Sequence, residues 1–271
     1  MAVDAGALGF LSLEITGKCQ LNCVHCYADS GPHGTHGTMS KEVWSRVVDE
    51  AAAIGVSRVQ LIGGEPTLYP AFSELVRYAV DRGLEVEVYS NLVRPFSEEL
   101  WGVFALPRVR LATSYYSNDA AEHDAITGRR GSHQRTLGNI REALRRGIPL
   151  RAGVIAVNPG QRAPMAVERL RALRIAQVDY DELRQLGRGV RDHEPDRVDQ
   201  LCGGCGDRRV AVSPTGDVWP CPMSRWIVLG NVAQSSLAHI YEASAETRRL
   251  LQEELHSFGD DDGGLHGSIV L

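Results

Sequence analysis

The six cysteines of this 271-residue chain fall into two groups of three, with none left over. The first group lies within eight residues and the second spans the stretch from 202 to 221: Cys19, Cys23, Cys26 and Cys202, Cys205, Cys221. The N-terminal residues lack the basic stretch of a secretory signal, and no segment approaches the roughly 20 apolar residues of a membrane span. We therefore expect a cytoplasmic protein whose cysteines serve metal or redox sites rather than disulfides.

The overall composition is that of an ordinary globular protein. Hydrophobic residues make up 43% of the chain and charged residues 23%, which is enough apolar material for a sizeable core. The net charge is −5. A negative chain has no bulk attraction for nucleic acid or for an anionic membrane, and we expect neither as a partner.

The first two thirds of the sequence alternate β-rich runs with helical segments. Strands are expected at 10–16, 58–62, 85–90, 108–114, 150–157 and 177–180. Helices are expected at 40–53, 70–82, 97–104, 134–146 and 162–173, with Ser40 as an N-cap and Pro70 at a first helical position. This alternation predicts an α/β fold, a partial (β/α)6 barrel with fewer units than the eight of a closed barrel.

The pattern changes near residue 190. A polar connector leads to a predicted hairpin with strands at 208–213 and 218–220, joined by a Pro-Thr-Gly-Asp turn. A helix is expected at 237–255. We therefore predict three regions: a barrel at 1–190, a small hairpin-plus-helix extension at 191–257 and a disordered tail at 258–271.

The first cysteine group has the spacing C-x3-C-x2-C and follows the first predicted strand. Structural zinc takes four ligands, and ordinary iron–sulfur clusters take four cysteines. Three thiolates therefore leave one metal position open for a chelating substrate. The alternative is a zinc site with His25 as the fourth ligand, but a side chain adjacent to Cys26 converges poorly on the same ion.

This loop resembles the signature of the radical S-adenosylmethionine (SAM) superfamily. The resemblance implies that Cys19, Cys23 and Cys26 hold a 4Fe–4S cluster whose open iron binds the amino and carboxylate groups of SAM. It also places His25 near the adenine. A second similarity is the run Gly63-Gly64-Glu65-Pro66 after the second strand, which is similar to the motif that binds the methionine amino group.

Glycines at 63 and 64 would let the backbone approach a ligand closely, although a plain Gly-Gly turn with a solvated Glu65 fits the same letters. Other cofactor contacts implied by the resemblance lie at later strand ends. They are Ser90 and Asn91 for the ribose, Ser114 for the cofactor generally, and Arg151 or Arg184 for the methionine carboxylate. Spacing does not choose between the two arginines, and a strand-end serine or a solvated arginine is the ordinary alternative.

The second cysteine group continues as C-x10-G-x4-C from Cys205 to Cys221, with Gly216 as the glycine. This resembles the start of the SPASM or shortened "twitch" extension, which holds auxiliary iron–sulfur clusters. A full SPASM extension has seven cysteines, so three allow one auxiliary cluster at most. Its fourth ligand stays open between Asp207, His193, a tail histidine, substrate or none, and a Cys3His zinc site or an empty site are alternatives.

The resemblance implies that an external electron donor such as flavodoxin or ferredoxin reduces the first cluster. SAM is then cleaved to a 5′-deoxyadenosyl radical that abstracts hydrogen from the substrate. We expect a ribosomally synthesised precursor peptide that becomes crosslinked, with Tyr115 and Tyr116 either lining the site or packing beneath a loop. The alternatives are a dehydrogenase or epimerase of an aminoglycoside-like sugar, and a zinc-stabilised scaffold or binding protein without radical chemistry.

Overall fold

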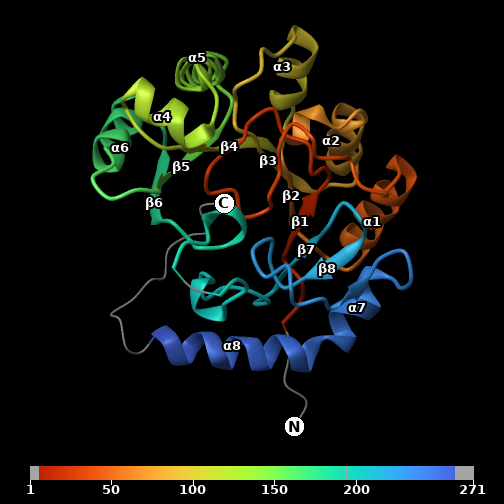
Figure 1. Cartoon of the computed structure of the whole chain (residues 1–271). Helices are drawn as coiled ribbons and strands as arrows, with labels where there is room; N and C mark the ends of the chain where they lie inside the picture. Colours follow the sequence, from red (N-terminus) through yellow and green to blue (C-terminus); the bar gives the residue numbers. More distant parts are fainter. Residues whose placement is uncertain (1–5, 193, 260–271) are drawn as a thin grey trace.

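A computed structural model describes residues 6–192 and 194–259 of the chain. Its centre is a curved sheet in which six parallel strands stand side by side in chain order (Figure 1). They are β1 (Phe10–Glu14), β2 (Arg58–Ile62), β3 (Glu85–Tyr89), β4 (Val109–Tyr115), β5 (Leu150–Ala156) and β6 (Gln177–Glu182). The predicted partial barrel is confirmed, and the strand bounds agree with the expected ones within a few residues.

Six helices cover the outer face of this sheet (Figure 1). They are α1 (Lys41–Ala53), α2 (Phe72–Asp81), α3 (Glu98–Phe104), α4 (Ala120–Thr127), α5 (Ser132–Arg145) and α6 (Ala163–Ala172). The Ser40 side chain caps α1 by accepting from the Val43 N–H at 3.4 Å. The prediction for Pro70 was wrong, because α2 begins at Phe72 after the N-cap Ala71.

The core lies between the strands and the helices. Neighbouring strands set apolar residues side by side, as in the pairs Leu11↔Val59 and Leu13↔Leu61 of β1 and β2. All four of these side chains are fully buried. Near-continuous burial is typical of parallel strands that are covered on both faces.

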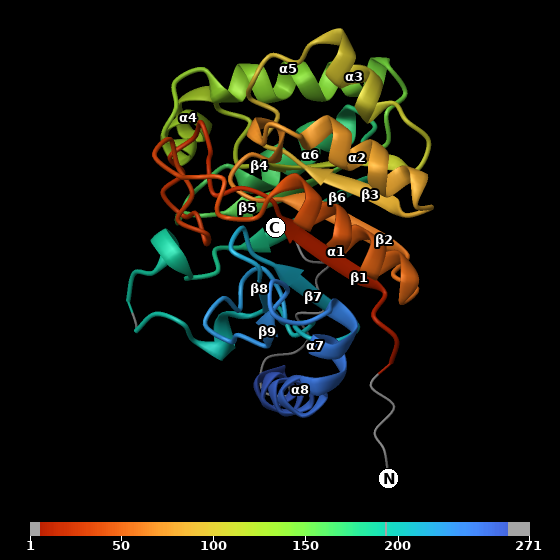
Figure 2. The same cartoon turned by 90° about the vertical axis from the view of Figure 1, so that its right-hand side faces the viewer.

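The C-terminal part adds three short strands and two helices: β7 (Arg209–Val212), β8 (Asp217–Trp219), β9 (Gly230–Asn231), α7 (Leu237–Ala243) and α8 (Ala245–Gly259). β7 pairs with β1 in parallel register, so the predicted hairpin continues the barrel sheet, and β8 and β9 extend it antiparallel (Figure 2). The helix expected at 237–255 is divided in two at Ser244.

The regional division at 190/191 stays a prediction. α8 continues to Gly259, two residues into the tail expected from 258, and residues 260–271 lie outside the described part of the chain. Within the described part, no helix combines the length and the apolar character that crossing a membrane requires.

Candidate active site at the carboxyl ends of the strands

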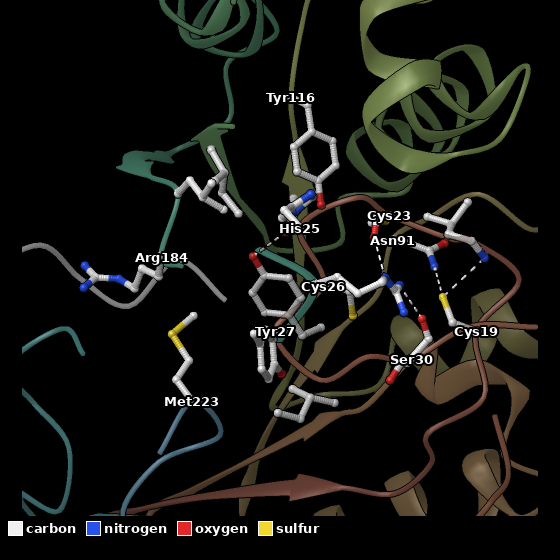
Figure 3. A pocket seen from close by; sticks show the side chains of 18 of the residues that line it. Cys19, Cys23, His25, Cys26, Tyr27, Ser30, Asn91, Tyr116, Arg184 and Met223 are labelled. Atoms are coloured by element: carbon white, nitrogen blue, oxygen red, sulfur yellow. Dashed lines mark hydrogen bonds between the residues drawn. The ribbon is translucent and has the colours of Figure 1, made fainter. Parts of the chain in front are cut away.

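A cavity of about 960 Å³ lies at the carboxyl ends of β1 to β6. The loop after β1 supplies all three cysteines of the first group to its wall, together with His25 (Figure 3). The ends of the next strands add Gly63, Gly64, Asn91 and Ser114. This end of a parallel sheet is where α/β folds bind ligands, because loops from several strands converge there.

Backbone hydrogen bonds from other elements fix the cysteine loop. The Cys19 N–H donates to the Gly31 carbonyl at 3.0 Å. Asn22 and Val24 donate to the Thr127 and Ile126 carbonyls at the end of α4, at 3.1 and 3.0 Å. The helix α4, which was not expected from the sequence, therefore holds the middle of this loop.

Arg188 braces the same loop from far along the chain. Its guanidinium donates to the Cys23 carbonyl at 2.9 Å and to the Ser30 carbonyl at 2.7 Å, and it pairs with Asp29 at 2.5 Å. The preceding Gly187 has φ +53°, and a Cβ there would lie 2.4 Å from the Tyr27 carbonyl oxygen. In the sequence, Arg188 stands between two glycines, a pattern that is typical of the start of a linker and does not indicate a contact with the cysteine loop.

Two thiols of the first group, those of Cys19 and Cys23, are shielded from water. Burial raises the pKa of Cys19 to about 12, and burial likewise raises the pKa of Cys23. Neutral thiols must therefore lose protons to metal as a cluster assembles. Within residues 6–192 and 194–259, no three His, Cys, Asp or Glu side chains converge on a single-ion position. Each thiolate of a 4Fe–4S cluster binds a different iron, so this arrangement does not require such convergence.

His25 presents a neutral ring to the cavity. Burial, with the charges of Arg188 and Arg191, lowers its pKa to about 4. The ring packs edge-to-face on Tyr116 with centroids 4.9 Å apart, and its buried Nδ1 has no hydrogen-bond partner among the residues that the structure describes. An unpartnered buried nitrogen beside an aromatic wall is a feature that a bound heteroaromatic group would satisfy.

The two glycines after β2 are required by the cysteine loop itself. Gly63 has φ +140°, and a Cβ there would lie 2.2 Å from the Thr16 carbonyl oxygen. A Cβ on Gly64 would lie 2.4 Å from the Lys18 carbonyl oxygen and 2.9 Å from the Cys19 Cβ. Only residues without a side chain allow the β2 turn and the cysteine loop to share this wall of the cavity.

Glu65 is buried but does not line the cavity. Its carboxylate accepts from the Thr67 hydroxyl at 2.6 Å, the Ser90 hydroxyl at 2.9 Å and the Asn91 N–H at 2.9 Å. It thereby ties the turn after β2 to the end of β3. Burial raises its pKa, against the opposing effect of these hydrogen bonds. Ser90 and Pro66, which opens a short 3-10 helix at Pro66–Leu68, also lie outside the cavity wall.

Asn91 lines the cavity, unlike Glu65, Pro66 and Ser90. Its Nδ2 lies 3.6 Å from the Cys19 Sγ, and its Oδ1 accepts from Gln20 at 2.8 Å. Ser114 also lines the cavity, where its hydroxyl lies 3.0 Å from that of Tyr89. Of the two tyrosines singled out in the sequence, Tyr116 lines the cavity, whereas Tyr115 is hydrogen-bonded to His133 at 2.8 Å.

Arg151 and Arg184, the two candidates for the methionine carboxylate, lie in different cavities. Arg184 lines the cavity and is held by Asp181 at 3.2 Å. Arg151 lies instead in a different cavity at the amino ends of the strands, bonded to Glu87 at 2.8 and 3.0 Å.

The second cysteine group lies beneath the first cavity. The Sγ atoms of Cys205 and Cys221 are 2.7 Å apart in a buried cluster that also includes Ile62 and Met223. Met223 also lines the cavity at the carboxyl ends of the strands (Figure 3). Among the fourth-ligand candidates, Asp207 is exposed, and His193 lies outside the described residues.

Comparison with known proteins decides the family. A match to the radical SAM superfamily covers residues 13–172, more than half of the chain. The chain belongs to the radical SAM superfamily. A second match, to the SPASM iron–sulfur cluster-binding domain, covers residues 202–261. Membership implies a 4Fe–4S cluster and SAM as cofactors, and the SPASM match implies auxiliary iron–sulfur binding.

The curated relatives include a bacteriocin biosynthesis protein and a peptide cyclase. The chain is 27% identical to the antilisterial bacteriocin subtilosin biosynthesis protein AlbA of Bacillus subtilis, over 92% of this chain and 62% of AlbA. It is 28% identical to the PqqA peptide cyclase of Xanthomonas euvesicatoria, over 84% of this chain and 73% of that protein. The chain thus spans less than two thirds of the length of AlbA.

The fold has solved counterparts. Streptococcus suis SuiB bound to S-adenosylmethionine superposes with a TM-score of 0.71 at 14% identity, over 87% of this chain and 66% of SuiB. At that identity the likeness concerns the fold alone.

Proposed function

We propose that this radical SAM protein modifies a ribosomally synthesised precursor peptide, through crosslinking or a related change. The observation that carries the proposal is one cavity whose wall combines three thiols, two glycines and Asn91, with a second cysteine group directly beneath it. The relatives named above, one a peptide cyclase, favour a peptide over an aminoglycoside-like sugar.

In this proposal the residues divide the work of binding. Cys19, Cys23 and Cys26 would hold the 4Fe–4S cluster, and Gly63 and Gly64, in the same cavity wall, would bind the methionine part of SAM. Asn91, Ser114 and His25 would bind the ribose and adenine, and Arg184 is the arginine available for the methionine carboxylate. When bound, the cluster and SAM supply the hydrogen-abstracting radical chemistry.

Glu65 and Arg188 act through other residues in this scheme. Glu65 positions Asn91 through its backbone N–H, and Arg188 positions the cysteine loop through the Cys23 carbonyl. Apolar and aromatic side chains cover much of the remaining wall and exclude water from the reacting carbon: Leu21, Ile62, Tyr89, Tyr116, Ile155 and Met223.

The partners and the compartment follow from the same chemistry. An external one-electron donor such as flavodoxin or ferredoxin has to reduce the cluster, because the protein's own side chains supply no electrons of that potential. Six free thiols and a reducible cluster need a reducing compartment, for which we propose the cytoplasm.

The experiment supplies anaerobically reconstituted protein with SAM and dithionite. One arm receives a short peptide encoded beside this gene and the other an aminoglycoside-type amino sugar. We expect 5′-deoxyadenosine together with a mass change in the peptide, read by mass spectrometry. Turnover of the sugar with an unchanged peptide would replace the proposal with the small-molecule alternative.

A further inference from the structure

A second cavity, of about 1,070 Å³, lies at the opposite end of the barrel, at the amino ends of the strands. Four arginines line it, and they come from β2, β4, β5 and β7: Arg58, Arg110, Arg151 and Arg209. The only carboxylate in its wall, among the residues described, is that of Glu87. Cys221 of the second cysteine group lines one side of this cavity, and Arg209 lies beside that group, but the first cysteine group lies at the other end of the barrel.

One side of this cavity is a preformed row of polar side chains. Strand register sets Ser12, Gln60 and Glu87 side by side on β1, β2 and β3. The Ser12 hydroxyl donates to Gln60 at 3.1 Å, and the Gln60 amide donates to Glu87 at 2.7 Å. All three residues are 1% exposed. The wall is therefore fixed before any ligand arrives.

Three carboxylates lie near these arginines. Glu87 pairs with Arg151 at 2.8 Å and with Arg110 at 2.6 Å, and Glu85 pairs with Arg58 at 2.5 Å. The charge of Asp179 also acts on Arg151. Four guanidinium groups against three carboxylates leave one positive charge in excess around the cavity. Like charges held together in a partly buried space repel each other unless an anion balances them.

Two of the arginines retain unused donors. The Arg110 Nε is buried and has no hydrogen-bond partner among the described residues. The Arg209 Nε makes a long hydrogen bond to the Asp207 carbonyl at 3.4 Å, and no carboxylate in the described part of the chain forms an ion pair with Arg209. A buried donor without an acceptor is a cost that a bound oxygen atom removes.

We propose that this cavity binds a small oxyanion, a phosphate- or carboxylate-bearing molecule, through the unused donors of Arg110 and Arg209. Guanidinium groups suit such ligands because their planar array of donors matches two oxygens at once. A small molecule fits better than a protein partner, because the polar row that forms the wall lies inside the barrel. The site is separate from the radical SAM cavity, which lies at the other strand ends, and the proposal does not rest on the peptide proposal.

The test uses titration calorimetry on the reconstituted full chain, with inorganic phosphate in one arm and citrate in the other. Sodium chloride at matched ionic strength controls for general screening. We expect saturable binding of at least one oxyanion and none of chloride. The arm that binds more tightly identifies phosphate or carboxylate as the preferred group.

Variants connect that binding to the arginines. Arg209→Gln and Arg110→Gln should each weaken oxyanion binding by about tenfold or more, the loss expected for one charge-assisted contact. Arg77→Gln, on the exposed face of α2, is the matched control and should leave it unchanged. Absence of saturable binding in both arms, or equal binding by all three variants and the parent chain, overturns the proposal. Thermal melts show whether each variant is folded, and Arg209 is the safer of the two because Arg110 also pairs with the buried Glu87.

Discussion

The two cysteine groups supply the same three ligands in opposite surroundings. The first lies in one loop, and its thiols form part of the wall of an open cavity. The second is assembled from both sides of the β7–β8 hairpin and is packed among apolar side chains such as Leu186, Leu251 and Leu255. Ligand count alone therefore does not define a site; the space left beside the ligands does.

That difference assigns different tasks to the two groups. A metal position left open beside a cavity can accept a chelating cofactor, whereas the leucines packed around the second group leave less room for one. The second group is closer to a structural or electron-transfer role. Each prediction below compares the two groups directly.

The largest effect should come from the first group. Replacing Cys19, Cys23 and Cys26 with Ala should lower 5′-deoxyadenosine production by more than about 1,000-fold, because the reaction has no other route to the radical. The measurement is chromatography of the product after reduction with dithionite. Production at a rate near that of the parent chain would refute the assignment of this group.

Replacing Cys202, Cys205 and Cys221 should separate two activities. Cleavage of SAM should fall by about tenfold at most, the smaller effect expected of groups that do not touch the reacting cofactor, while peptide turnover stops. Iron and sulfide analysis provides the control for loss of one cluster only. Undiminished peptide turnover would show that the second group is structural.

The same substitution, Gly→Ala, can be made beside each cysteine group. Gly64→Ala should weaken SAM binding by up to about 100-fold, because a Cβ 2.4 Å from the Lys18 carbonyl oxygen displaces the cysteine loop. Gly204→Ala, beside the second group, meets nothing nearer than the Arg209 guanidinium carbon at 3.5 Å and should change binding little. Equilibrium dialysis measures both. Equal losses would mean that the first loop is more pliable than its contacts indicate.

The smallest difference concerns the thiols of the cluster-free protein. A hydrogen bond from the Cys205 thiol lowers the pKa of Cys202, whereas burial raises the pKa of Cys19 to about 12. A lowered pKa means that thiolate is present at lower pH, so Cys202 should react with iodoacetamide at neutral pH and Cys19 only near pH 12. Mass spectrometry of anaerobic samples over a pH series reads each site. The reverse order would contradict the comparison.

The sequence predicted the barrel well because parallel strands leave a strong local signal. The runs at 58–62 and 150–157 are β-rich and bounded by helical segments, and they correspond to β2 and β5. α4 was missed because its eight residues include buried His123 and show little amphipathic pattern. The break at Ser244 was missed because helical periodicity continues on both sides of it.

The cavity was predictable where neighbours in sequence stay neighbours in space. Cys19 to Cys26 and Gly63–Gly64 meet that condition. The burial of the Glu65 side chain depends on two hydrogen-bond donors, the Ser90 hydroxyl and the Asn91 N–H, which lie 25 and 26 residues further along the chain. Nothing local to Arg151 indicates that its side chain runs toward the amino end of the barrel, and Arg188 acts on a loop 165 residues away.

A three-residue segment of the extension belongs to both ends of the barrel. Cys221 and Pro222 line the cavity at the amino ends of the strands, and Met223 lines the cavity at their carboxyl ends. The backbone there is short, so a displacement that enlarges one cavity is felt at the other within two peptide units. Thermodynamic linkage then requires reciprocity. If a ligand in the arginine-lined cavity shifts this segment and changes the affinity of the cysteine-lined cavity for its ligand, the second ligand must change the affinity for the first by the same factor.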